Sequence, residues 1–178
     1  MSNPAVFLDR DGVLCRTFVH NRKSYAPRKL RDFFLMPYTQ NSIAQLKQAG
    51  FKVIVVTNQP DIGNGFVDLS VVESMHQKLL SKTLIDDVFL CAHRQDEYCK
   101  CRKPRPDMLL AAAEKHNIDL SKSYIVGDRA SDIEAGHRAG CKTVFIDRHY
   151  SEARPEKPET IVHSLQKAVK YILINKSL

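Results

Sequence analysis

The stretch that decides the fold is residues 5–13, AVFLDRDGV, in which a short apolar run stops at two acidic residues. Ala5–Leu8 is entirely apolar and predicts a short strand with both faces buried, as in a parallel sheet. Asp9 and Asp11 follow this run two residues apart, and Gly12 ends the strand pattern. Parallel sheets bind ligands at the carboxyl ends of their strands, so this stretch predicts a polar site where the first strand ends.

Apolar runs alternate with helical patterns through the rest of the chain. The β-branched run Lys52–Val56 is typical of an internal parallel strand, and Gly50 and Gly140 are suited to end helices. This alternation predicts the α/β fold class with a doubly wound parallel sheet. We expect strands at Ala5–Leu8, Lys52–Val56, Val88–Cys91, Ser123–Val126 and Thr143–Ile146, and helices at Tyr38–Gln48, Leu69–Leu80, Pro106–His116, Ser131–Ala139 and Pro158–Ile174.

The length of 178 residues and the 43% of hydrophobic residues favour a single domain, 1–178, with its own core. Few glycines (7) and prolines (8) exclude a disordered chain. The apolar runs are far shorter than the ~20 residues of a transmembrane helix, and Met1–Pro4 leads into the first strand without an export signal. We therefore expect a cytoplasmic protein with no membrane partner, whose function lies in the non-periodic segments Arg10–Arg31 and His93–Arg105.

The charge of the chain favours an anionic partner. The formal net charge is +7 and the sequence pI is about 9.2, but the cations form no long basic run. A basic cleft that concentrates small phosphorylated substrates explains this charge as well as nucleic-acid binding does.

The ends of the later strands carry further polar groups. Thr57-Asn58-Gln59 follows the second strand, Asp128 and Asp132 follow the fourth, and Arg102-Lys103 lies between the third and fourth. Carboxylate oxygens suit Mg²⁺, while the hydroxyl, amide and cationic groups suit phosphate oxygens. The combination predicts phosphoryl transfer to a carboxylate nucleophile.

The cysteines point to a second metal. Cys91, His93, Cys99 and Cys101 supply three thiolates and one imidazole, a complete tetrahedral zinc set with no open position. We therefore predict a structural Zn²⁺ in a loop at 91–105, against the alternatives of free surface thiols and of a catalytic zinc. An odd total of five cysteines argues against a disulfide framework. Cys15, in the loop after the first motif, either lines the pocket or has an ordinary role, and both interpretations stay open. We expect Cys141 to be buried. We expect ordinary roles for the histidines placed in helices, His76, His116, His137 and His163.

Four ordered motifs resemble those of the haloacid dehalogenase (HAD) superfamily of phosphatases. They are Asp9-x-Asp11-Gly12-Val13, Thr57, Lys103 and Gly127-Asp128-x3-Asp132. The resemblance implies a Rossmann-like HAD fold over nearly the whole chain.

The same resemblance implies the roles of the site residues. Asp9 is the nucleophile that forms an aspartyl-phosphate, and Asp11 is the general acid and then the general base. Thr57 and Lys103 bind the transferring phosphoryl group. Asp9, the backbone carbonyl of Asp11 and Asp128 hold the Mg²⁺. Asp132 either orients Lys103 or a metal-bound water, or simply favours the start of a helix.

The zinc loop that runs into Arg102-Lys103-Pro104 is similar to that of a small, capless group within the superfamily. This group contains the histidinol-phosphate and D-glycero-D-manno-heptose-1,7-bisphosphate phosphatases. It implies a monomeric enzyme acting on a small phosphorylated substrate, with short loops such as Cys15–Pro27 over the site. The heptose bisphosphate 7-phosphatase activity is preferred, and histidinol-phosphate phosphatase is the alternative. We expect Asn58, Arg102, Arg129 and Tyr25 to bind the substrate, with both arginines on its second phosphate.

Two other functions stay open from the sequence. The basic pI and the motif Thr57-Asn58-Gln59 are also compatible with a 3′-phosphatase acting on DNA ends, although no basic patch with interleaved aromatic residues accompanies them. A zinc-bearing binding module would not need all of the strand-end acids. Pro60-Asp61 departs from the heptose group, which usually carries Ser-Gly there, and places an acid near the expected pocket.

Overall fold

The computed structural model describes residues 2–176, which are built around a six-stranded sheet. The strand order is β5-β4-β1-β6-β7-β8, and each neighbouring pair is parallel. The chain runs outward from β1 through β4 to β5, and then crosses back to β6 on the other side of β1. Ligands bind at such a reversal of strand order. The strands are β1 (Ala5–Leu8), β4 (Lys52–Asn58), β5 (Asp87–Cys91), β6 (Tyr124–Gly127), β7 (Lys142–Ile146) and β8 (Thr160–Val162).

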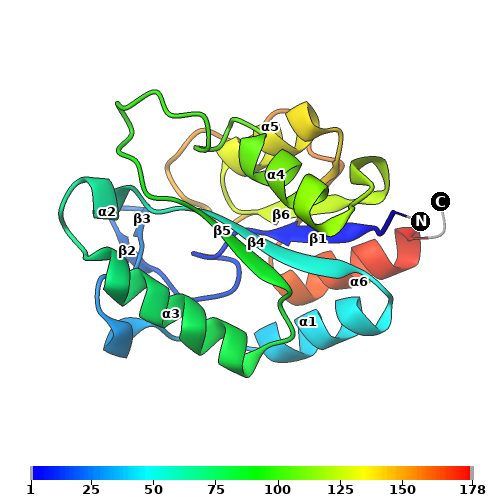
Figure 1. Ribbon diagram of the computed structural model, residues 1–178, viewed down its shortest axis with the longest axis horizontal. Helices are drawn as coiled ribbons and strands as arrows, with labels where there is room; N and C mark the ends of the chain where they lie inside the picture. The colour runs from blue at the N-terminus through cyan, green and yellow to red at the C-terminus, as the bar shows by residue number, and fades with distance from the viewer. Residues whose placement is uncertain (1, 177–178) are drawn as a thin grey trace.

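Helices cover both faces of the sheet (Figure 1). On one side are α4 (Asp107–His116) and α5 (Ala130–Ala139), and on the other are α1 (Thr39–Gln48), α3 (Leu69–Lys82) and α6 (Leu165–Asn175). The side chains of β1 alternate between these layers, as the pleat of a strand requires. Val6 and Leu8 pack with α1, α3 and α6, whereas Ala5 and Phe7 pack with α4 and α5. The predicted α/β fold with a doubly wound parallel sheet is confirmed.

The last predicted helix is wrong in its first part. Residues 160–162 form the edge strand β8, and α6 begins only at Leu165, after the Ser164 hydroxyl accepts a hydrogen bond from the Lys167 N–H. The sequence Thr-Ile-Val is β-branched and favours an extended chain, and a serine is a good helix N-cap. Ile161 is therefore half exposed on the edge strand, and His163 lies outside the helix.

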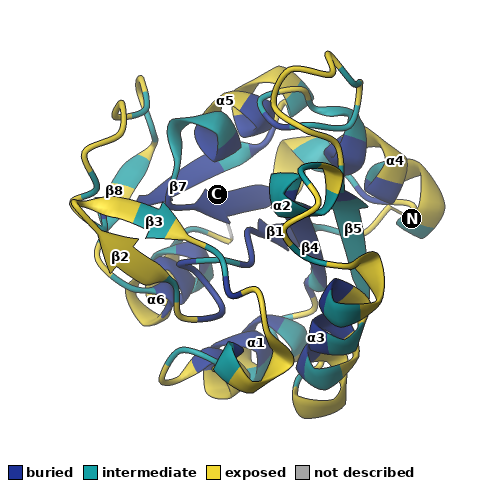
Figure 2. Cartoon of the chain, turned by 90° about the vertical axis from the view of Figure 1, so that its left-hand side faces the viewer, coloured by how far each residue is buried: buried dark blue, intermediate teal, exposed yellow. Residues whose placement is uncertain are grey.

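Small elements that the sequence pattern does not predict lie over the carboxyl ends of the strands. Between β1 and α1 lie the hairpin β2 (Phe18–His20) and β3 (Lys23–Tyr25) and the 3-10 turn η1 (Leu30–Asp32). Another short helix, α2 (Pro60–Gly63), follows β4, and a 3-10 turn, η2 (Leu120–Lys122), precedes β6. Figure 2 shows the exposed hairpin beside the buried strand ends. The hairpin β2-β3 is a small insertion between β1 and α1, which is consistent with the expectation of an enzyme without a large cap domain.

Among residues 2–176, no helix combines the length and the hydropathy needed to cross a membrane.

Candidate active site

A buried ion cluster lies where β1 ends. The Lys103 Nζ is 2.9 Å from Asp9 Oδ1 and 2.6 Å from Asp132 Oδ1, and it also donates to the Val56 carbonyl at 2.7 Å. All three charged side chains are almost completely buried. Burial raises the pKa of Asp9 to about 6, although the charge of Lys103 opposes this rise. Burial would lower the pKa of Lys103, but the charges of Asp132 and Asp9 raise it instead, so the lysine stays cationic.

Asp128 adds a third carboxylate to this cluster. Carboxylate oxygens of Asp9, Asp128 and Asp132 all lie within 4.8 Å of one another. Both oxygens of Asp128 are buried and have no hydrogen-bond partner within residues 2–176. Burial and the neighbouring Asp9 charge raise the pKa of Asp128 well above its ordinary value. Three acids facing one lysine leave a deficit of positive charge, and an oxygen-only donor set fits a hard cation such as Mg²⁺.

Gly12 makes the approach of Asp128 geometrically feasible. Its φ is +81°, and a Cβ at this position would lie 2.0 Å from Asp128 Oδ2. Any side chain at residue 12 would therefore displace this carboxylate as well as strain the backbone.

Asp132 has two partners at the start of α5. Its Oδ2 accepts a hydrogen bond from the Arg129 N–H at 3.1 Å, while its Oδ1 pairs with Lys103. Both roles expected for this residue, ordering the lysine and starting a helix, are thus present in the geometry.

Asp11 lies apart from the three clustered carboxylates. Its side chain pairs with Arg10 and accepts hydrogen bonds from Gln59 and Cys15. Burial would raise the pKa of Asp11, but the Arg10 charge and these hydrogen bonds lower it. Cys15 is completely buried beside Asp11 and is not among the residues that line the cavity above Asp9. Cys141 is buried, as expected.

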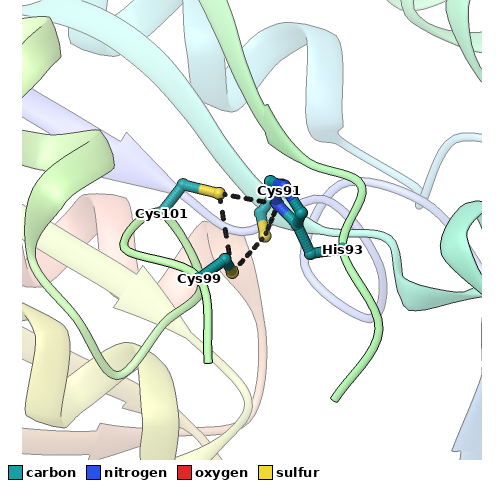
Figure 3. Close-up of side chains that lie close together, drawn as sticks. All are labelled: Cys91, His93, Cys99 and Cys101. Atoms are coloured by element: carbon teal, nitrogen blue, oxygen red, sulfur yellow. Dashed lines mark hydrogen bonds between the residues drawn. The ribbon is translucent and has the colours of Figure 1, made fainter. Parts of the chain in front are cut away.

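The four predicted zinc ligands come together at the end of β5 (Figure 3). The Sγ of Cys91 is 3.6 Å from the Sγ of Cys99, and the His93 Nδ1 is 3.2 Å from the Cys101 Sγ. The sulfur atoms are much farther apart than the ~2.05 Å of a disulfide bond. Four ligands at ~2.3 Å from a zinc ion would be roughly 3.8 Å from one another, which is close to these separations. The cluster could therefore hold a zinc ion.

Asn58 joins this loop to the sheet. Its side-chain amide donates to the Lys103 carbonyl and accepts from the Lys103 N–H, both at 3.1 Å. The side chain that we expected to contact the substrate thus also fixes the backbone that carries Lys103.

A cavity of about 670 Å³ opens above Asp9 and Lys103. The expected substrate residues Tyr25, Asn58, Arg102 and Arg129 all line it. The Nη1 of Arg102 is buried without a hydrogen-bond partner among the described residues. In contrast, Arg129 pairs with Glu152 and donates to the Ser24 carbonyl at 3.2 Å.

An ion pair that was not expected from the sequence lies at the mouth of the cavity. Arg28 Nε is 2.7 Å from Asp61 Oδ2, and the Arg28 guanidinium lies over the Phe66 ring, 4.5 Å from its centre. Arg28 comes from the loop after the hairpin and Asp61 from α2. Nothing in either segment signals a contact between residues 33 positions apart.

Comparisons with known proteins agree with this geometry. A family model described as HAD-hydrolase-like matches residues 100–168. A D-glycero-beta-D-manno-heptose-1,7-bisphosphate 7-phosphatase from Pseudomonas aeruginosa is 36% identical over 153 residues, 82% of this chain and 82% of the relative. A protein of the same name from Helicobacter pylori is 36% identical over 151 residues, 82% of this chain and 84% of the relative.

A solved structure shares the fold over nearly all of this chain. It is the D,D-heptose 1,7-bisphosphate phosphatase of B. bronchiseptica, complexed with magnesium and phosphate. The TM-score is 0.82 at 26% sequence identity, covering 97% of this chain and 99% of that one. These relatives are phosphatases, which disfavours a binding module without catalysis. The chain belongs to the HAD-like phosphatases, in the family that contains the heptose-1,7-bisphosphate phosphatases.

Proposed function

We propose that the protein is a Mg²⁺-dependent phosphatase that removes the 7-phosphate from D-glycero-D-manno-heptose 1,7-bisphosphate. The observation that carries this proposal is the buried Asp9, Lys103, Asp128 and Asp132 cluster beneath a cavity with several arginines. The names of the relatives supply the substrate class.

In the first step, an Asp9 carboxylate oxygen attacks phosphorus and the bond from phosphorus to the sugar oxygen breaks. Asp11 is ionised in the free protein, because Arg10 lowers its pKa. It takes up a proton when the anionic substrate binds beside it, and gives this proton to the departing sugar oxygen. In the second step, a water oxygen attacks phosphorus, the bond to Asp9 breaks, and Asp11 takes a proton from the water. Inorganic phosphate leaves, Asp11 releases its proton, and both aspartates return to their starting forms.

Lys103 and Thr57 bind the phosphoryl oxygens throughout these steps. Lys103 already lies 2.9 Å from the nucleophile, so its ammonium group is in place to bind the incoming phosphate without a rearrangement. Mg²⁺ bound to Asp9, to the backbone carbonyl of Asp11 and to Asp128 would neutralise further phosphoryl charge.

The second phosphate would bind Arg102, because a guanidinium matches phosphate oxygens in two-point hydrogen bonding. Among the described residues, the buried Nη1 of Arg102 has no hydrogen-bond partner to give up. Arg129 would have to exchange Glu152 for the substrate, so we assign it the smaller share.

We further propose that Zn²⁺ occupies the Cys91, His93, Cys99 and Cys101 cluster and has a structural role. The four ligands would fix the loop that presents Arg102 and Lys103. Metal-binding thiols suit a reducing compartment, so we place the protein in the cytoplasm. We also propose that it acts as a monomer. Elemental analysis should find one zinc ion per chain. The Cys99→Ser variant should lower both the zinc content and the turnover. A zinc-free protein with full activity would contradict this structural role.

A substrate panel tests the proposed function. Phosphate release should require Mg²⁺, and kcat/KM should be higher for the heptose 1,7-bisphosphate than for histidinol phosphate, whose amine the arginines repel. Faster turnover of histidinol phosphate would move the assignment to that activity. Turnover of a 3′-phosphorylated oligonucleotide alone would favour the DNA-end phosphatase, and full activity in excess chelator would contradict the metal requirement.

A further inference from the structure

Arg10, the residue between the two acids of the first motif, is completely buried. A buried guanidinium is costly unless its charge and its N–H groups find partners. Its Nη2 donates to both oxygens of Asp11, at 3.0 and 2.9 Å, and its Nε lies 3.2 Å from each. The positive charge of Arg10 therefore faces the Asp11 carboxylate from the protein interior.

His76 on α3 holds the other end of this guanidinium. The Arg10 Nη1 is 3.1 Å from the His76 Nε2, and the Phe33 ring centre is 5.6 Å from the guanidinium carbon. Arginine has only donors, so the His76 Nε2 must accept, and the ring is neutral with its proton on Nδ1. Burial and the charge of Arg10 lower the pKa of His76 to about 4, which keeps this acceptor available at neutral pH.

Gln59 contacts Asp11 from another direction. Its Nε2 is 2.5 Å from Asp11 Oδ2 and 2.8 Å from Thr57 Oγ1. A carboxylate only accepts hydrogen bonds, so the amide nitrogen must face Asp11. The Thr57 hydroxyl then accepts the second amide hydrogen, which leaves its own hydrogen free for a phosphoryl oxygen.

We propose that Arg10, His76 and Gln59 are positioning residues that hold the Asp11 carboxylate for proton transfer and direct the Thr57 hydroxyl at the phosphoryl group. The inference rests on the roles of Asp11 and Thr57 in the proposed function. None of the three residues needs to touch the substrate.

The leaving group provides the readout. An alkyl phosphate needs a proton on its departing oxygen, whereas p-nitrophenyl phosphate has a leaving group that departs without one. Misplacing Asp11 should therefore slow the alkyl ester much more than the aryl ester. A general loosening of the fold would slow both esters equally.

His76 offers the cleanest variants, because it lies on a helix outside the ion cluster. With saturating Mg²⁺, His76→Leu should lower kcat for glycerol 2-phosphate by about 10- to 100-fold, since small misplacements of reacting groups have costs of this size. It should change kcat for p-nitrophenyl phosphate less than about threefold, because that ester bypasses general-acid assistance. His76→Gln restores an acceptor and should recover most of the alkyl activity.

Met75→Ala is the matched control, since Met75 is a buried neighbour on α3 in the apolar core. It should destabilise the protein without changing the ratio of the two kcat values. Gln59→Met should additionally weaken inhibition by inorganic phosphate several-fold, because the Thr57 hydroxyl loses its orientation, whereas His76→Leu should not.

Three results would overturn the proposal: equal losses on both esters in His76→Leu, a change of the kcat ratio in Met75→Ala as large as that in His76→Leu, or no recovery in His76→Gln. These esters do not depend on the sugar. A wild-type protein that hydrolyses them but not the heptose bisphosphate would refute only the proposed substrate. One that hydrolyses neither the two esters nor the heptose bisphosphate would overturn both proposals.

Discussion

The cavity has a buried floor and an exposed rim, and the two are built differently. We define the floor as Asp9, Thr57, Lys103, Asp128 and Asp132, whose side chains are almost fully buried at the ends of β1, β4 and β6 and on the adjoining loop and helix. We define the rim as Tyr25, Arg28, Asp61, Arg102 and Arg129, which come from loops and α2 and are partly exposed.

Because of this difference, we expect the floor to carry out the reaction and the rim to select the substrate. Removing one partner of a buried ion pair costs about 3–5 kcal/mol, whereas an exposed pair contributes about 0–1 kcal/mol. The floor therefore keeps one arrangement for every phosphate ester. The rim can exchange its ion pairs for a substrate at little cost, so selectivity for one sugar must come from there.

Removing the nucleophile should give the largest effect. Asp9→Asn should lower kcat by at least about 10³-fold for every ester, because no covalent intermediate can form. The folded pKa of Asp9, about 6, lies above the ordinary value of 3.8, so its charge destabilises the metal-free fold at neutral pH. Lys103 keeps its ion pair with Asp132 in the variant, so its buried charge is not left unpaired. The variant should therefore unfold at the same or a higher temperature, and a large loss of stability would show that Asp9 is structural.

The next largest effect should come from Arg102, whose buried Nη1 has no hydrogen-bond partner within residues 2–176. Arg102→Ala should lower kcat/KM for the heptose bisphosphate by about 10- to 100-fold, the cost of a charge-assisted contact of ~1.5–3 kcal/mol. A monophosphate should lose much less. Arg105→Ala, an exposed arginine of the same loop, serves as the control, and equal losses on both substrates would remove Arg102 from the specificity site.

The pH dependence of stability tests whether His76, which lies behind the floor, is buried as a neutral imidazole. Its pKa is about 4 in the folded protein and ordinarily 6.5, so the unfolded chain binds more protons between these values. Stability is then full above about pH 6.5 and is lost as the pH falls toward 4, by about 1–2 kcal/mol between pH 7 and 5. Chemical denaturation of the wild type and of His76→Gln at both pH values measures this loss. The variant should lose less unfolding free energy between pH 7 and 5 than the wild type does. Equal losses would mean that His76 is accessible to protons.

The smallest effect should arise at the exposed pair. Asp61→Asn frees Arg28 and removes a negative charge from the rim, which should lower KM for the bisphosphate by about two- to fivefold, within the range of an exposed ion pair. Turnover at saturation should not change. Asp68→Asn removes an equal charge from an exposed position and should leave KM unaltered. An increase in KM would mean that the ion pair itself shapes the pocket.

The floor was predictable from sequence because its residues follow apolar strands that converge on one edge. Asp9, Thr57 and Asp128 each come directly after such a run, and Lys103 follows a complete set of metal ligands. The Cys and His spacing likewise predicted a four-residue cluster.

The remaining contacts were hidden because they join distant parts of the chain. Arg10 meets His76 across 66 positions, and nothing local distinguishes that histidine from others on helices. The strand β8 was missed because its partner, β7, decides whether a β-branched run becomes a strand or joins the following helix. The hairpin β2-β3 has exposed side chains and so lacks the alternation that marks a half-buried strand.

Chemical capture of the covalent intermediate tests the central claim most directly. Borohydride reduces an acyl phosphate to an alcohol, so quenching the wild-type enzyme during turnover should convert Asp9 into homoserine, which mass spectrometry of the residue 5–13 region reveals. We expect this conversion only with substrate and Mg²⁺ together, and not in Asp9→Asn. Phosphate release at the full rate with an unmodified Asp9, or conversion of Asp11 instead, would contradict the account.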